Sequence, residues 1–195
     1  MSGVLVAAPM RVEQLLIRSA ARGARVVRTG MGPRKSRAAA AELSQQEGDA
    51  LLVLGFCGGL DAESLPGDVV VADDVLVAAD EQHVAERLSC DRSESLARAL
   101  GRAGLRVRMG PIVCVSRIAL GERRAELRAS GAIAVDMESA WLAPGARGRP
   151  FDVVRVVLDS PSHELLRPGA AAGAARAARA LRRVARELSD FGTDG

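Results

Sequence analysis

The chain has 195 residues, of which 48% are hydrophobic, and a formal net charge of +3. This length and composition indicate one globular domain and exclude an intrinsically disordered chain. Lys35 is the only lysine, and one Trp, three Phe and no Tyr leave too few aromatics for the stacking surface of a nucleic-acid binder.

Cysteine and histidine are too few and too scattered for a metal site or a disulfide framework. The three cysteines, Cys57, Cys90 and Cys114, form no C-x-x-C pair, and the chain has only two histidines. We therefore expect no metal and no resident cofactor. The first ten residues lack the basic start of a signal peptide, and no apolar run approaches the ~18 residues of a membrane span. These features favour a cytoplasmic protein.

Short apolar runs alternate with helical patterns along the chain, which is typical of an α/β fold whose sheet is covered on both faces. In the first half we expect strands at 3–8, 25–29, 50–54 and 68–77, and helices at 13–22 and 34–47. Pro33 stands at the start of the second helix, where its missing N–H costs little.

The second half continues the alternation up to a long closing helix. We expect helices at 93–103, 122–130, 138–142 and 170–188, and strands at 106–115, 132–135 and 151–158. The Gly- and Pro-rich segment 144–150 is predicted to be a turn inside one domain. This domain spans residues 1–191, and residues 192–195 form a flexible tail.

The segment from Gly55 to Gly59 follows a buried strand and is predicted to be a glycine-rich loop. Its glycines would let a ligand approach the backbone, and the alternative is a tight turn. The G-x-G-x-x-G spacing of a dinucleotide site is absent here. It is absent after Gly30 too, where Lys35 stands in place of the third glycine.

Acidic residues stand where the expected strands end. Asp136 and Glu138 lie between a strand and a helix, where they either cap the helix or face the ligand crevice at the carboxyl edge of the sheet. Asp159 ends the valine-rich run 153–158. It either starts a turn or, being partly desolvated, favours its protonated form and serves as a general acid. Glu13 on its own is typical of the first turn of a helix.

Taken in order, these segments resemble the nucleoside phosphorylase and nucleosidase superfamily. The matching segments are 8–13, 30–33, 55–60, 66–71, 134–140 and 155–159, which span most of the chain. The resemblance implies a three-layer α/β/α fold with a central mixed, partly barrel-like sheet. It also implies an enzyme that cleaves the N-glycosidic bond of a purine nucleoside, and a homo-oligomer.

Within the superfamily the chain most resembles the hopanoid-associated phosphorylases, through segments 30–33, 131–139 and 150–155. This similarity implies release of adenine from adenosylhopane in hopanoid side-chain synthesis, and hence a lipid-linked substrate. The alternatives are a methylthioadenosine, adenosylhomocysteine or futalosine nucleosidase and, from another class, a non-catalytic nucleoside-binding module.

The resemblance assigns a role to each acidic residue. Asp159 protonates or hydrogen-bonds purine N7, Glu138 holds the ribose hydroxyls, and Glu13 activates water. Leu158 departs from the family pattern, which has a serine before the aspartate, so one orienting hydrogen bond is lost. The implied substrate-binding residues are Phe56, Cys57, Gly58, Ile118, Asp136 and Met137.

The nucleophile is either water or phosphate. Arg11 and Gly32 are the candidate phosphate-binding residues, and phosphate would then be a co-substrate. However, Phe56 and Val53 stand where the phosphorylases that the chain resembles carry a hydroxyl residue and a second arginine. One arginine alone is a poor site for a phosphate dianion, so we expect hydrolysis.

The closing helix is amphipathic, with arginines opposite an apolar stripe. The arginines are Arg176, Arg179, Arg182, Arg183 and Arg186, and the stripe is Leu181, Val184 and Leu188. The expected role of the stripe is packing on the sheet, and the alternative is peripheral membrane contact. We expect no nucleic-acid partner.

Overall fold

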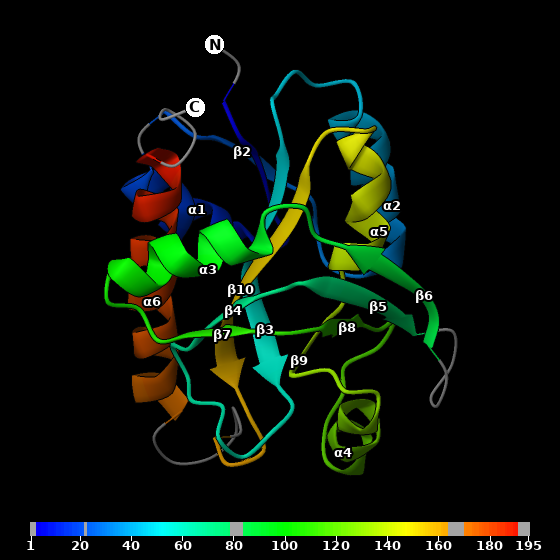
Figure 1. Cartoon of the computed structure of the whole chain (residues 1–195), viewed down its shortest axis with the longest axis vertical. Coiled ribbons are helices and arrows are strands. Elements are labelled where there is room, and N and C mark those ends of the chain that lie inside the picture. The colour runs from blue at the N-terminus through cyan, green and yellow to red at the C-terminus, as the bar shows by residue number, and fades with distance from the viewer. Residues whose placement is uncertain (1–2, 22, 79–83, 164–169, 191–195) are drawn as a thin grey trace.

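The computed structural model of the chain describes residues 3–21, 23–78, 84–163 and 170–190 (Figure 1). The strands are β1 (Leu5–Ala8), β2 (Arg25–Arg28), β3 (Leu51–Gly59), β4 (Val69–Val71), β5 (Asp74–Ala78), β6 (Val84–Ser89), β7 (Val107–Met109), β8 (Ile112–Cys114), β9 (Ala134–Asp136) and β10 (Phe151–Asp159). The helices are α1 (Arg11–Ala20), α2 (Pro33–Leu43), α3 (Ser93–Arg102), α4 (Glu122–Ala129), α5 (Ser139–Leu142) and α6 (Ala170–Asp190), with a 3-10 helix, η1 (Ala143–Ala146). The expected helix end at residue 22 and the tail 192–195 lie outside the described residues.

The strands of the described residues form one mixed sheet that branches at β3. The main path runs β6-β5-β8-β9-β3-β10-β4-β7, while β1 pairs with the first half of β3 and with β2. β3 and β10 are parallel along nearly their whole length, whereas β9 pairs antiparallel with the last two residues of β3. The sheet therefore changes partners along β3 and curls there, as the partly barrel-like prediction requires.

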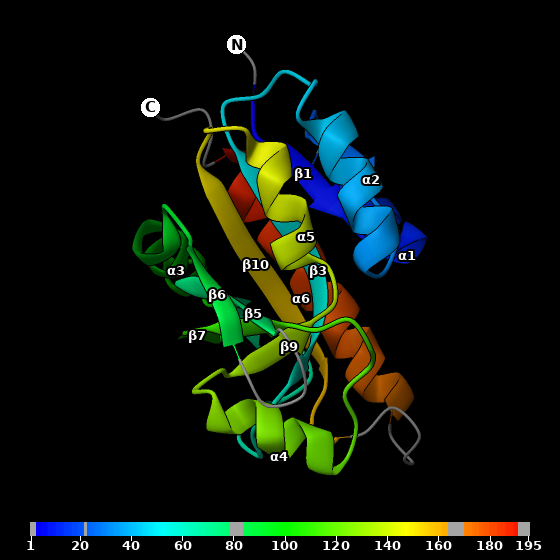
Figure 2. The same cartoon turned by 90° about the vertical axis from the view of Figure 1, so that its right-hand side faces the viewer.

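Helices cover both faces of the sheet, which confirms the predicted three-layer α/β/α fold (Figures 1 and 2). On one face, α1, α3 and α6 bury Ile17, Leu100 and Leu181. On the other face, α2 and α5 bury Leu43 and Leu142. A sheet that is buried on both faces explains why its long strands are continuous apolar runs in the sequence.

The apolar stripe of α6 packs on the sheet, as expected. Leu181, Val184 and Leu188 are buried in the same cluster as Val154 and Val156 of β10. No helix among the described residues is both long and apolar enough to cross a membrane.

The structure corrects several predicted boundaries. The predicted glycine loop 55–59 is the second half of β3, because Gly58 and Gly59 pair with β9. The predicted strands at 68–77 and 106–115 are two strands each, since the chain changes place in the sheet at residues 72–73 and 110–111. The turn expected at 144–150 contains η1. We did not predict β6, because an edge strand with exposed Glu86 and Arg87 lacks the apolar run of a buried strand.

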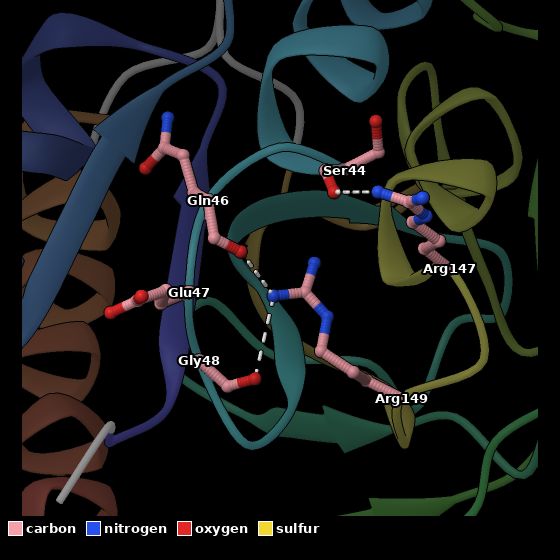
Figure 3. A pocket seen from close by; sticks show the side chains of 6 residues that line it. All are labelled: Ser44, Gln46, Glu47, Gly48, Arg147 and Arg149. Carbon is pink, nitrogen blue, oxygen red and sulfur yellow. Dashed lines mark hydrogen bonds between the residues drawn. The ribbon is translucent and has the colours of Figure 1, made fainter.

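At the amino-terminal ends of β3 and β10, Arg149 ties several chain segments together (Figure 3). Its guanidinium uses all five N–H groups. They donate over 2.7–3.4 Å to the carbonyl oxygens of Leu43, Gln46, Gly48, Gly145 and Ala146. Carbonyls at helix ends lack intrahelical donors, so this arginine is a structural clamp.

Arg149→Met is expected to lower the free energy of unfolding by about 2–4 kcal/mol, because several carbonyl oxygens lose their donors together. Arg147→Met is the matched control, since the exposed Arg147 makes one 3.4 Å bond to the Ser44 carbonyl. The free energy of unfolding of this control variant should fall by less than about 0.5 kcal/mol. Urea unfolding followed by circular dichroism measures both; equal losses would contradict the clamp.

Candidate functional site

The carboxyl ends of β1, β3 and β10 meet at one edge of the sheet, because these strands are parallel to one another. A cavity of about 280 Å³ opens there. Helix α1 follows β1 and supplies Glu13, the turn after β9 supplies Glu138, and β10 ends on Asp159. All three acidic residues line the cavity.

The predicted substrate-binding residues line the same cavity. These are Phe56, Cys57, Gly58, Ile118, Asp136 and Met137. Burial raises the pKa of the Cys57 thiol, so this side chain forms an uncharged wall rather than a nucleophile. Three apolar side chains of the lining are well exposed, Met31 (47%), Ile118 (68%) and Leu120 (59%), and they give the cavity an apolar mouth.

The two candidate phosphate-binding residues are placed differently. The Gly32 N–H donates to Glu138 Oε1 at 3.2 Å, so this donor is engaged within the protein. Arg11 is exposed and lines a neighbouring cavity of about 390 Å³ together with Arg28 and Lys35. Phosphate binding by Arg11 and Gly32 stays a prediction.

Arg155 of β10 lies at the centre of the acidic group. Its side chain is completely buried, and its Nη2 lies 2.6 Å from Asp136 Oδ2 and 3.4 Å from Glu138 Oε2. Asp136 also accepts hydrogen bonds from the backbone N–H groups of Glu138 and Ser139 and from the Ser139 hydroxyl. Asp136 thus compensates a buried cation and accepts hydrogen bonds from the backbone at the start of α5, whereas the N-cap residue itself, Glu138, makes no side-chain capping hydrogen bond.

Glu13 is fixed by two backbone donors. Its side chain is buried, and its oxygens accept hydrogen bonds from the N–H groups of Phe56 at 2.6 Å and Met10 at 2.5 Å. Burial raises the pKa of Glu13, against the opposing effects of Arg155 and these two N–H groups. A Cβ at Gly55 would lie 2.5 Å from Glu13 Oε1. This glycine therefore makes room for a side chain of the site, rather than for a ligand.

Glu138 shares the same desolvated environment. Burial raises the pKa of Glu138 to about 7, while Arg155 lowers it and the charge of Asp136 raises it further. A carboxyl group whose pKa lies near neutrality can take up and release protons under physiological conditions, as general acid–base chemistry requires.

Asp159 is buried, as expected for a partly desolvated carboxylate, but it also has a cationic partner that the sequence analysis did not predict. Arg124 of α4 lies against it, with Nη2 2.5 Å from Oδ2 and both side chains under a tenth exposed. Gly58 permits this contact, because a Cβ there would lie 3.2 Å from Arg124 Nη2.

Sequence reasoning missed the two arginines of the site. Arg155 had a usable signal, since an arginine within a valine-rich strand buried on both faces must find a buried partner. Arg124 had none, because it is one of several arginines in a polar helix.

Glu138→Gln tests the environment of this carboxyl group through the pH dependence of stability. The folded-state pKa of Glu138 is about 7, above the ordinary 4.5, so the protonated side chain contributes its full stability below about pH 4.5. This contribution is lost as the pH rises through about 7. The Tm of the variant relative to wild type should therefore increase between about pH 5 and about pH 8. Glu42→Gln, at an exposed site on α2, is the control. A difference that stays constant with pH would contradict the assigned burial effect.

Comparisons with known proteins agree with this architecture. The model of the Phosphorylase superfamily matches residues 12–188. The AMP nucleosidase of Escherichia coli strain K12 is 31% identical over 185 residues, a match that covers 80% of this chain and 37% of the relative. The chain thus spans little more than a third of the length of the curated relatives it matches.

Two solved structures illustrate the likeness in fold. The 5'-methylthioadenosine/S-adenosylhomocysteine nucleosidase of Neisseria meningitidis, in complex with methylthio-immucillin-A, has a TM-score of 0.76 at 22% identity and covers 96% of this chain and 98% of its own. Futalosine hydrolase of Helicobacter pylori strain 26695 has a TM-score of 0.81 at 17% identity, and the match covers 97% of this chain and 98% of the hydrolase chain. With the family match extending over most of its length, this chain belongs to the phosphorylase superfamily.

Proposed function

We propose that the chain hydrolyses the N-glycosidic bond of a purine nucleoside that carries an apolar substituent at C5′. The observation that carries this proposal is the convergence of Glu13, Glu138 and Asp159 on one cavity. The similar proteins named AMP nucleosidase, methylthioadenosine/adenosylhomocysteine nucleosidase and futalosine hydrolase support this reaction class.

The three carboxyl groups divide the reaction between them. The C1′–N9 bond breaks with its electron pair going to the base, and the ribose passes through an oxocarbenium-like state. Water adds its oxygen to C1′ and gives a proton to Glu13, whose raised pKa suits a general base. Glu138 accepts hydrogen bonds from the ribose hydroxyls, and Asp159 faces the base. The purine takes a proton from solvent after release, which balances the reaction.

The apolar mouth supports the choice of substituent. Met31, Ile118 and Leu120 present exposed apolar surface around the cavity, and such surface favours a hydrocarbon group over a charged one. Adenosylhopane fits this requirement, in line with the resemblance to the hopanoid-associated phosphorylases. Methylthioadenosine, adenosylhomocysteine and futalosine are the alternative substrates.

The electrostatics favour water over phosphate as the nucleophile. Glu13, Glu138 and Asp136 surround the buried Arg155, whose Nη2 already contacts two carboxylates. The Gly32 N–H is engaged by Glu138. A phosphate dianion among these carboxylates would therefore be repelled, whereas a neutral water molecule would not.

Base release from a nucleoside panel tests the proposal. The base released from each nucleoside is measured by chromatography, and the panel contains adenosylhopane, methylthioadenosine, adenosylhomocysteine, futalosine and AMP. The base should be released fastest from adenosylhopane, at a rate independent of added phosphate. The sugar product should carry a free C1′ hydroxyl. A requirement for phosphate would overturn hydrolysis, and release from no nucleoside would leave the non-catalytic binding module.

Glu13→Gln is expected to lower kcat/KM by about 10²–10⁴-fold, the contribution of a general base. In wild type, activity should fall as the pH drops through the raised pKa of Glu13, because the base must be ionised. Glu42→Gln should match wild type at every pH. Unchanged kcat/KM in Glu13→Gln would show that the water is activated elsewhere.

A further inference from the structure

Exposed apolar side chains surround the opening of the reaction cavity. Met31 stands between β2 and α2, and Ile118 and Leu120 precede α4, which lies beyond the carboxyl ends of β3 and β10 (Figures 1 and 2). All three line the cavity, and between 47% and 68% of each is exposed. Single apolar residues on a surface are ordinary, whereas apolar residues gathered at one place mark a contact site.

A basic cavity of about 390 Å³ adjoins this opening and shares Met31 with it. It is lined by three exposed cations, Arg11, Arg28 and Lys35. Their side chains make no ion pair or hydrogen bond with the residues that the structure describes. No acidic side chain among the described residues lines the basic cavity, and those that line the reaction cavity are buried. The opening therefore presents uncompensated positive charge.

The backbone at Gly30 makes room for one of these cations. Gly30 has a φ of +82°, and a Cβ there would lie 2.8 Å from Lys35 Cδ. The stem of the lysine thus packs against the backbone, in the space that a side chain would fill. This packing places the only lysine of the chain on the wall of the basic cavity.

Apolar and basic side chains on one face need a partner that offers both complements. A small anion would neutralise the cations but leave Met31, Ile118 and Leu120 in water. The surface of an anionic bilayer offers phosphate groups to the cations and acyl chains to the apolar residues. The net charge of the chain is only +3, so its attraction to such a surface depends on where the cations are grouped.

We propose that this opening is a peripheral docking surface for an anionic lipid bilayer. Its apolar residues enter the interface, and its three cations contact lipid phosphates. The inference rests on the proposed function, because a nucleoside with an apolar C5′ substituent would then pass from bilayer to cavity without exposing that substituent to water. The apolar stripe of α6 offers no such surface, since it is buried on the sheet.

Co-sedimentation of the full chain with vesicles tests the electrostatic part. Wild type should bind vesicles of phosphatidylcholine mixed with an equal amount of phosphatidylglycerol, more weakly as salt is added, and should bind pure phosphatidylcholine poorly. Arg28→Glu combined with Lys35→Glu should weaken binding to the mixed vesicles by about 10- to 100-fold. Arg179→Glu combined with Arg182→Glu reverses the same number of exposed charges on α6 and is the matched control; it should bind like wild type.

Leu120→Asp tests the apolar part. It should weaken binding to the mixed vesicles by about 10-fold or more, because an inserted leucine is replaced by a charge. Met109→Asp is the control, since Met109 is also about half exposed but belongs to β7; it should lose much less affinity. Thermal melting checks that each variant is folded.

Three results would overturn the inference. The first is a wild type that does not bind the mixed vesicles, while calorimetry shows binding of inorganic phosphate or of neither. The second is an equal loss of binding in the two double variants, which would show adsorption through overall charge. The third is a Leu120→Asp variant that binds vesicles like wild type but changes the sedimentation coefficient of the lipid-free protein, because a second copy would then cover the opening.

The two proposals fail separately. If wild type releases base from a water-soluble nucleoside but binds no vesicles, this inference fails and the proposed function stands. If vesicle binding requires Arg28, Lys35 and Leu120 but no nucleoside of the panel releases its base, the proposed hydrolysis fails and the docking surface stands.

Discussion

The burial of Arg155 is the constraint on which the arrangement of the cavity depends. A guanidinium with no exposed surface must be compensated within the protein. Asp136 provides the compensation, and in doing so ties β10 to the end of β9. Glu138 follows two residues later and is held against the same cation. Removing one partner of such a buried pair typically costs about 3–5 kcal/mol, so the residues that line the cavity also hold the sheet together there.

The glycines of β3 allow side chains of the site to pack directly against this strand. Gly55 and Gly58 lack the Cβ atoms that would collide with Glu13 and press on Arg124. The side chains can therefore lie directly on the strand, away from water. Desolvation then raises the pKa of both Glu13 and Glu138, that of Glu138 to about 7, which suits these glutamates to proton transfer better than exposed ones.

The two edges of the sheet use arginine in opposite ways. At the amino-terminal edge, every N–H group of Arg149 is matched by a carbonyl oxygen, and the result is a rigid junction. At the carboxyl edge, Arg124 and Arg155 each keep a buried Nη1 without a partner in the described part of the chain. Unsatisfied donors are rare in protein interiors. Of the two arginines, Arg124 lines the cavity, whereas Arg155 lies buried behind Asp136 and Glu138.

The sequence by itself determined the class of fold and the acidic residues of the site. Apolar runs and amphipathic helices have local periodicities, so the alternation of β and α elements could be predicted, and parallel strands necessarily bring their carboxyl ends to one edge. Glu138 and Asp159 could be placed there for that reason, whereas Glu13 was assigned to the site by the family resemblance. Only the tertiary structure decided that the glycine segment is a strand and that β6 exists, because each depends on which strand pairs with it.

The contact between Arg124 and Asp159 joins residues 35 positions apart, through a helix whose pattern is simply polar. Nothing local in the sequence encodes which arginine of that helix turns inward, since its partners, Asp159 and the Ala119 carbonyl, belong to other segments that only the fold brings to it.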